Sequence, residues 1–157
     1  MKKINLGILS LSLAVPAAAQ VQNDERPNVI LIYADDLGYG DLQCYGAKNV
    51  ATPNVNRLAD NGIRFTNAYS VAATSTPSRY GILTGEYPFR KQGTDVAAGD
   101  AAMIISPEQQ TVADLFKEAG YATAAFGKWH LGLGAESGKQ NWNAPLEPAL
   151  DDIGFDY

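Results

Sequence analysis

An uninterrupted apolar run over residues 29–33 constrains the fold of this 157-residue chain more than any other feature. Its side chains do not alternate between apolar and polar, so a strand formed from it would be buried on both faces. Such strands belong to parallel sheets covered by helices. A second run, residues 121–126, follows a segment with helical periodicity, and this strand–helix–strand order indicates a right-handed crossover. The sequence therefore predicts an α/β fold with a mostly parallel sheet between helices.

Shorter signals predict the remaining elements. Residues 52–62 begin with Thr-Pro and end with Gly, which predicts a short helix. Residues 63–69 are predicted to form a third strand. Residues 86–102 show no clear hydrophobic periodicity, so a loop is predicted there. Residues 106–120 open with Ser-Pro-Glu-Gln, the pattern of a capping box, and end in Gly, so a helix is predicted over that range.

Residues 1–20 have the composition of a secretory signal peptide. Two lysines precede an apolar run, and small residues ending near Ala19 offer a cleavage site. The run is shorter than the roughly 20 apolar residues that a membrane span needs, and Pro16 interrupts it. No cysteine follows that could carry a lipid. We therefore expect an exported protein, secreted or periplasmic, without a membrane anchor.

The net charge argues against nucleic acid as a partner, and the cysteine content argues against a disulfide-stabilised fold. Removal of residues 1–20 takes Lys2 and Lys3 from the 12 basic residues and leaves all 17 acidic ones, so the exported part has a net charge of −7. Nucleic acid is excluded as a partner by this charge. Cys44 is the single cysteine, so the chain has no internal disulfide framework.

Two adjacent carboxylates, Asp35 and Asp36, directly follow the first apolar run. Ligands of open α/β sheets lie beyond the carboxyl ends of the strands, which is where these side chains are expected. Neighbouring acids repel each other, and a hard cation such as Ca²⁺ would stabilise them. The simpler interpretation of the pair is a solvated polar loop.

A second candidate site is the segment from Thr74 to Arg79, which contains Ser75 and Pro77. Proline suits the first turn of a helix, and hydroxyl groups before it can cap the helix, so Ser75 is predicted to lie at a helix N-terminus. Arg79 follows one turn later on the same face. The free N–H groups, the helix dipole and the arginine together favour an oxyanion such as a sulfate or phosphate ester. A plain helix cap is the alternative.

The third candidate site follows the second apolar run and contains Lys128 and His130. In an extended chain alternate side chains point the same way, so both are predicted to face one side. His130 is the only histidine of the chain. A solvated lysine beside a structural histidine is the alternative.

Three segments of the chain resemble the type I sulfatases, which belong to the alkaline-phosphatase-like superfamily. They are residues 34–42 with the paired aspartates, residues 75–85 with Ser-x-Pro-Ser-Arg-x-x-x-Leu-Thr-Gly, and residues 127–132 with Gly-Lys-Trp-His. They occur in the order that the family has. The resemblance implies the alkaline-phosphatase-like sulfatase fold, with residues 21–157 as the N-terminal portion of the catalytic domain and the C-terminal remainder absent.

The resemblance also implies a chemistry for the site. In this family the residue matched by Ser75 is oxidised after synthesis to formylglycine, whose hydrate has two hydroxyls: one attacks sulfur, and the other later expels sulfate. By the same resemblance, Ca²⁺ is bound by Asp35, Asp36 and the modified Ser75, and it polarises the sulfate. Serine rather than cysteine at position 75 is associated with a bacterial, oxygen-independent maturase, so a bacterial periplasm is the expected location.

The basic side chains have implied roles as well. Arg79 and Lys128 hold the hydrate and neutralise charge on the sulfuryl oxygens, and His130 takes the proton of the second hydroxyl. The implied reaction is hydrolysis of a sulfuric ester, in a sulfated carbohydrate or, as a second choice, an aryl sulfate.

Two other functions fit the same residues. A phosphoesterase or phosphonate esterase of the superfamily shares the anion site, and a non-catalytic homologue would bind the anion without turnover. Residues 1–157 alone are expected to be inactive, because two carboxylates fall short of the roughly 6 to 8 oxygen ligands that calcium takes.

Overall fold

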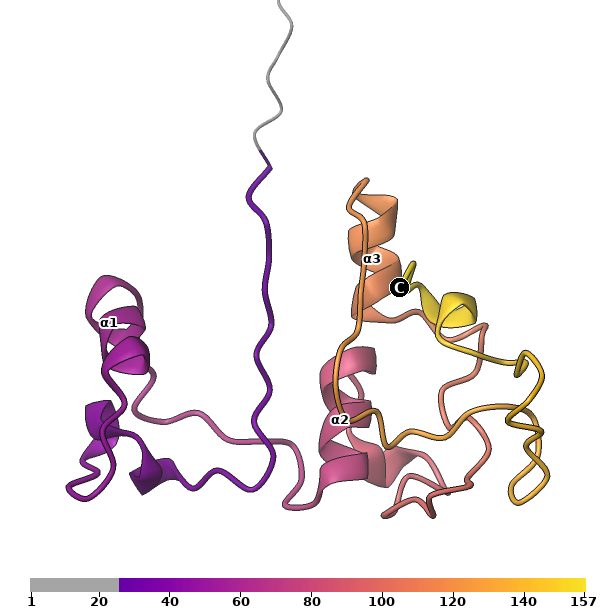
Figure 1. Cartoon of the computed structure of the whole chain (residues 1–157), viewed down its shortest axis with the longest axis horizontal. Helices are drawn as coiled ribbons and strands as arrows, with labels where there is room; N and C mark the ends of the chain where they lie inside the picture. Colours follow the sequence, from indigo (N-terminus) through magenta and orange to yellow (C-terminus); the bar gives the residue numbers. More distant parts are fainter. Residues whose placement is uncertain (1–25) are drawn as a thin grey trace, which may run out of the picture. The chain divides into compact units, whose positions relative to one another are not determined.

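The computed structural model describes residues 26–157 (Figure 1). The chain divides into two units, Met1–Ala34 and Asp35–Tyr157, and each is described by itself. The predicted signal peptide lies outside the described residues. None of the helices in residues 26–157 has both the length and the apolar character that crossing a membrane requires.

Short helices joined by long irregular segments make up residues 35–157. In chain order they are η1 (Tyr39–Asp41), η2 (Gln43–Tyr45), α1 (Pro53–Asn61), α2 (Ser75–Thr84), η3 (Pro88–Arg90), α3 (Val112–Glu118) and η4 (Asp151–Ile153), where η denotes a 3-10 helix. No β-strand occurs between residues 26 and 157. The predicted parallel sheet is therefore not confirmed.

The predicted strands over residues 29–33 and 63–69 are not formed. Both segments lack the ladder of backbone hydrogen bonds that defines a strand. Apolar side chains that the prediction placed in a core are exposed instead, among them Ile30 at 83% and Ile32 at 80%. The physical reason is that an extended segment becomes a strand only when a neighbouring segment pairs with its backbone, and no part of residues 26–157 pairs with these two in that way.

The predicted strand over residues 121–126 is also absent, although part of it has a neighbour. The N–H of Tyr157 donates to the carbonyl of Thr123 at 3.2 Å, and Tyr157 accepts from the N–H of Ala125 at 3.0 Å. One residue that bonds to two partners two positions apart is the pattern of a parallel pair. The Thr123 hydroxyl adds a bond of 2.6 Å to the carbonyl of Gly154. The segment is thus tied to the last residues of the chain without forming a strand.

The helix predictions are confirmed for α1 and α2, but the predicted start of α3 is wrong. The helix begins at Val112 and not near residue 107. Thr111 is its cap: its hydroxyl accepts from the N–H of Asp114, and the Asp114 carboxylate accepts from the N–H of Thr111 at 2.8 Å. This reciprocal pair is a capping box, so the chain uses the later of two similar signals. Residues 106–109 form a turn instead, closed by a bond from the Gln109 N–H to the Ser106 carbonyl.

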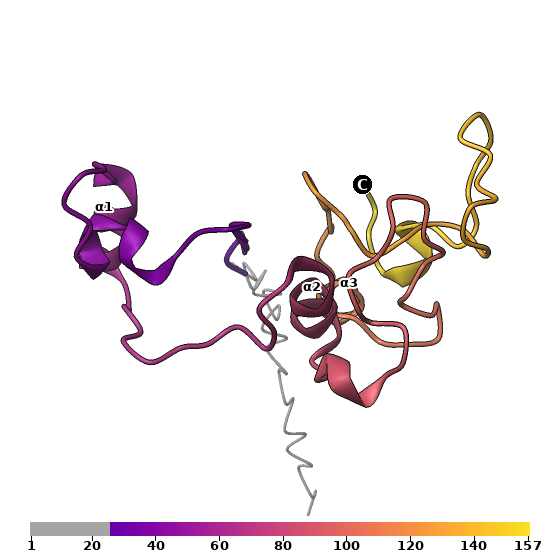
Figure 2. The ribbon, with the colours of Figure 1, turned by 90° about the horizontal axis from the view of Figure 1, so that it is seen from below.

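The core lies where α2 packs against α3 (Figure 2). It consists of six buried apolar residues: Tyr80, Ile105, Ala113, Leu131, Ile153 and Phe155. The hydroxyl of Tyr80 donates to Glu86 at 2.8 Å and accepts from the side-chain amide of Gln109 at 2.8 Å. Burial raises the pKa of Tyr80, which keeps the phenol protonated as a donor. The middle of α2 is therefore held from one side by packing and by hydrogen bonds.

Candidate active site

The N-terminal end of α2 presents Ser75 and Arg79. Ser75 is the first residue of the helix, as predicted, and Arg79 lies one turn later on the same face. The predicted side-chain cap is not formed, because Thr74 makes no capping bond with its hydroxyl. The first N–H groups of the helix, at the positive end of its dipole, therefore lack a side-chain cap.

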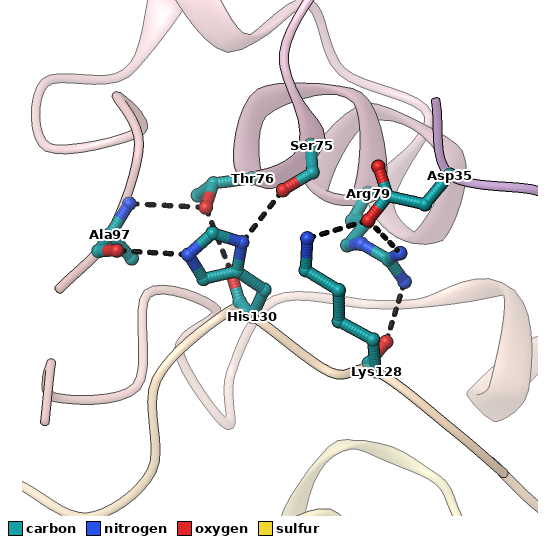
Figure 3. Close-up of polar contacts among 7 residues, drawn as sticks. All are labelled: Asp35, Ser75, Thr76, Arg79, Ala97, Lys128 and His130. Atoms are coloured by element: carbon teal, nitrogen blue, oxygen red, sulfur yellow. Dashed lines mark hydrogen bonds and ion pairs between the residues drawn. The ribbon is translucent and has the colours of Figure 1, made fainter. Parts of the chain in front are cut away.

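Ser75 is in direct contact with His130 (Figure 3). The Ser75 Oγ lies 2.6 Å from Nδ1 of the imidazole, and Nε2 lies 2.9 Å from the backbone carbonyl of Ala97. A carbonyl oxygen can only accept, so Nε2 carries the ring proton and donates it to Ala97. Nδ1 then has a free lone pair that accepts from the Ser75 hydroxyl. The neutral imidazole is thus set up as a base toward the side chain at position 75.

Thr76 links the two segments that hold the imidazole. Its hydroxyl donates to the backbone carbonyl of His130 at 2.9 Å and accepts from the N–H of Ala97 at 3.1 Å. Its side chain is fully buried. The four hydrogen bonds among Ser75, Thr76, Ala97 and His130 close a ring, visible in Figure 3.

No sequence signal predicts the role of Thr76 or of Ala97 at the site. Thr76 occupies the variable second position of the Ser-x-Pro motif, and the relevant groups of Ala97 belong to its backbone, which every residue has. Residue 97 also lies in a segment for which only a loop was predicted.

The backbone at His130 is not extended. The alternation of side chains along an extended chain therefore does not explain where the His130 side chain points. His130 has a left-handed φ of 58°, which is uncommon for a residue other than glycine. His130 contacts α2 through its side chain and Lys128 through its backbone carbonyl, which accepts from Arg79 (Figure 3). Gly132 follows with φ 73°, and a Cβ there would lie 1.8 Å from the carbonyl oxygen of Ala102. Only glycine allows this close approach.

Asp35 is paired with two cations. Its Oδ2 lies 2.5 Å from Nζ of Lys128 and 3.2 Å from a terminal nitrogen of Arg79. The same guanidinium donates to the backbone carbonyl of Lys128 at 2.5 Å. The Lys128 ammonium, with help from Arg79, lowers the pKa of the Asp35 carboxyl below its ordinary value. These three side chains, all predicted as site residues, are brought together.

Asp35 and Asp36 are the two carboxylates that the sequence predicts as calcium ligands. Asp36 is exposed and has a left-handed φ of 57°, a conformation that aspartate adopts more readily than most residues. Two carboxylates and the oxygen at position 75 are hard donors of the kind that Ca²⁺ prefers. No group of three or more His, Cys, Asp or Glu side chains that could hold a metal occurs in the part of the chain that the structure describes. The donors fit calcium in kind and fall short of a full ligand set in number.

A hollow of about 270 Å³ adjoins the imidazole. The residues that line it include Lys128, Trp129, His130 and Trp142. A cation, a histidine and two tryptophans therefore lie around one hollow.

These groups can bind an anion and remove a proton. Arg79, Lys128 and the start of α2 supply positive charge for an oxyanion. The lone pair of His130 faces a hydroxyl and can accept its proton. Because Nε2 of His130 bonds a carbonyl and not a carboxylate, the pair does not form a Ser-His-Asp triad.

Comparison with known proteins gives consistent results. A sequence model of the sulfatase family matches residues 27–156. An N-acetylgalactosamine-6-O-sulfatase of Bacteroides thetaiotaomicron is 55% identical over 136 residues, which are 87% of this chain and 26% of that protein. Human arylsulfatase A is 45% identical over 128 residues, 80% of this chain and 25% of that protein.

One solved structure is similar in both sequence and fold. It comes from work on glycosaminoglycan metabolism by Bacteroides thetaiotaomicron, and it matches with a TM-score of 0.81 and 55% identity over 84% of this chain and 27% of that one. The chain thus spans about a quarter of the length of these relatives.

Proposed function

Since the chain belongs to the sulfatase family, we propose that the full-length protein is a sulfatase that hydrolyses a sulfate ester. One observation carries this proposal: the Ser75 Oγ lies 2.6 Å from Nδ1 of His130 at the start of α2. Arg79 and Lys128 lie beside this pair and supply the positive charge that a sulfuryl group needs.

A sulfated carbohydrate is the proposed substrate, with the 6-O-sulfate of N-acetylgalactosamine as the first choice. The name of the relative that is 55% identical supports this choice. A small aryl sulfate is the second choice, supported by the 45% identity to human arylsulfatase A. Export to a bacterial periplasm and a formylglycine-generating maturase as a partner complete the proposal.

Ser75 needs conversion to formylglycine before it can react. A serine hydroxyl is a weak nucleophile toward sulfur unless a strong base activates it, and His130 has no carboxylate partner to strengthen it. Once formed, the hydrated aldehyde supplies two hydroxyls on one carbon, one to take the sulfuryl group and one to expel it as sulfate. The Ser75 Oγ in the structure stands in for one of these hydroxyls.

His130 acts as the base in this scheme. Its Nδ1 accepts the proton of the hydroxyl at position 75, and the carbonyl of Ala97 keeps the ring in the tautomer that leaves Nδ1 free. Histidine suits the task because its ordinary pKa lies near neutrality, so it can accept and release a proton at working pH.

Arg79 and Lys128 orient the sulfate and balance its charge. Asp35, Asp36 and residue 75 would hold Ca²⁺, which when bound polarises the sulfate and makes the hydroxyl at position 75 more acidic. In the structure Asp35 forms ion pairs with both cations.

Mass spectrometry of the peptide that spans Ser75, from the purified full-length protein, tests the proposal directly. We expect a mass two hydrogens below that of the serine peptide, together with faster hydrolysis of nitrophenyl sulfate than of nitrophenyl phosphate. Unmodified serine in an active preparation would overturn the formylglycine assignment. Preference for the phosphate ester would favour a phosphoesterase, and sulfate binding by converted protein without turnover would favour a non-catalytic homologue.

A further inference from the structure

We propose that Trp142 forms the wall of a sugar-binding subsite and that its indole stacks on the ring that carries the sulfate. This inference rests on the proposed function, since it gives the leaving alcohol of the ester a place beside His130. It assigns a role in specificity to a residue that lies outside the three segments with catalytic motifs.

The first supporting observation is the position of Trp142 in the hollow next to the imidazole. Trp142 lines the same hollow as Lys128 and His130. His130, whose imidazole contacts the Ser75 hydroxyl, thus forms part of the wall of this hollow. The side chain of Trp142 is 62% exposed, so the face of the indole is accessible to a ligand.

The second observation is the rigidity of the turn that carries Trp142. The Asn141 side chain accepts from the N–H of Asn143 at 3.2 Å, and its carbonyl accepts from the N–H of Ala144 at 3.0 Å. This makes Trp142 the second residue of a tight turn. An exposed indole on a fixed turn loses little conformational freedom when a ligand binds, which favours affinity.

The turn is in addition anchored to the segment that follows His130. The side-chain amide of Gln140 donates to the carbonyl of Leu133 at 3.0 Å and to the carbonyls of Asp100 and Ala101 at 2.9 and 3.1 Å. Leu133 lies three residues after His130. Trp142 and the imidazole therefore share one supporting framework.

The third observation is the contrast with Trp129, the second tryptophan of the chain. The indole of Trp129 donates to the carbonyl of Gly132 at 2.8 Å and packs edge-on against Phe155. Within residues 26–157, Trp142 has neither a hydrogen-bonding nor a ring partner for its indole. Trp129 thus has a structural role, whereas the ring of Trp142 is free to contact a ligand.

A sugar is the ligand that suits this surface. A pyranose ring has a face of C–H groups that can lie on an aromatic ring, while its hydroxyls stay at the edge and bond to polar groups. Lys128 lines the same hollow, and its ammonium has three N–H donors, one of which pairs with Asp35. A small aryl sulfate needs only the sulfuryl pocket and would gain far less from Trp142.

The test compares variants of the full-length, converted protein on two substrates. Trp142→Ala should lower kcat/KM about tenfold on a disaccharide that contains N-acetylgalactosamine 6-O-sulfate, mainly through a higher KM, and Trp142→Phe should retain most of the activity. On nitrophenyl sulfate, Trp142→Ala should stay within about twofold of the wild type. Phe89→Ala is the matched control, because Phe89 is 79% exposed and does not line the hollow.

A binding measurement separates this inference from the proposed function. In protein whose Ser75 is unconverted, calorimetry should show about tenfold weaker binding of the sulfated disaccharide to Trp142→Ala, with binding of inorganic sulfate unchanged. This result supports the subsite even if the protein turns over no sulfate ester. Equal losses on both substrates, equal losses for both ligands, or no loss at all would overturn the role given to Trp142.

Discussion

The two halves of the candidate site are built in different ways. Ser75, Thr76, Ala97 and His130 form a hydrogen-bonded cluster, a closed ring in which Thr76 is fully buried and backbone groups serve as partners. Asp35, Arg79 and Lys128 form an ion-paired cluster of side chains. In the ion-paired cluster the side chain of Asp35 is 31% exposed and that of Lys128 is 50% exposed.

This difference indicates which half of the candidate site the described part of the chain holds in place without a bound ligand. Partly buried hydrogen bonds to backbone groups hold atoms in place, because breaking one leaves a polar group without its partner. Ion pairs that solvent reaches contribute little to stability and are screened by salt. The hydrogen-bonded cluster is therefore a fixed frame, whereas the ion-paired cluster can rearrange when a calcium ion or a sulfate group binds.

The largest expected effect comes from breaking the hydrogen-bonded cluster at His130. In the full-length, converted protein, His130→Ala should lower steady-state turnover by roughly 10²- to 10⁴-fold, the usual contribution of a general base. The first half of the reaction does not need this base, so about one equivalent of alcohol per converted site should still appear while sulfate release stops. Rapid-mixing measurement of both products checks this. If a variant that binds calcium and carries the aldehyde shows no burst, His130 acts earlier or only structurally.

The next effect comes from removing the carboxylates at the edge of the ion-paired cluster. Asp35→Ala or Asp36→Ala should cost roughly 100-fold in kcat, because each removes a proposed ligand of the calcium ion that would stabilise developing charge. Asp41→Ala is the control: Asp41 accepts from the N–H of Gly38 at 2.7 Å and belongs to neither cluster. Rates and bound calcium are measured together. Near-normal rates for Asp36→Ala, with no response to added calcium, would refute the metal assignment.

A smaller effect is expected from Thr76→Val, which keeps the shape of the side chain and removes its hydroxyl. The carbonyl of His130 and the N–H of Ala97 both lose a partner, so kcat should fall roughly tenfold and the pH profile should change as the imidazole shifts. Thr76→Ser should restore both properties.

Thr94→Val supplies the matched control for Thr76→Val. The Thr94 hydroxyl is buried and bonds the carbonyls of Pro88 and Lys91, away from the imidazole. The Thr94→Val variant should lose as much thermal stability as Thr76→Val while keeping the pH profile of the wild type. Identical kinetic behaviour of the two valine variants would show that Thr76 supports the fold and not His130.

The smallest effect concerns the titration of Asp35. Because Lys128 and Arg79 lower its folded pKa, the ion pairs are fully present above the ordinary aspartate pKa of about 3.9 and are lost as the pH falls through the lower folded value. NMR titration of the side-chain carbon should show this, and Lys128→Met should raise the pKa toward the ordinary value. Titration of Asp35 above that value in the wild type would contradict the pairing.

The sequence was a good guide where local rules decide the structure. Proline in the first turn correctly predicts α2 with Ser75 at its start. Asp35 and Lys128 also meet at one site, although the strands from which this was predicted are not formed. The start of α3 was missed, because two segments carry nearly the same capping signal and Thr111 makes the actual cap.

Other features depend on partners that a local pattern cannot identify. The run over residues 29–33 is apolar enough for a buried strand, yet a strand needs a paired neighbour, and residues 26–157 provide none. The closed ring around His130 was not predictable either, since two of its links are backbone groups of Ala97.

The bond between Nε2 of His130 and the carbonyl of Ala97 makes proton exchange at the imidazole one-sided. With Nε2 committed to a group that can only accept, a proton that enters at Nδ1 has to leave at Nδ1 as well. The ring therefore cannot relay protons through itself to bulk water. In the proposed sulfatase reaction the ring would therefore lose its proton only when solvent reaches Nδ1, the atom that contacts residue 75. A product that stays bound there would delay the next cycle by blocking this deprotonation.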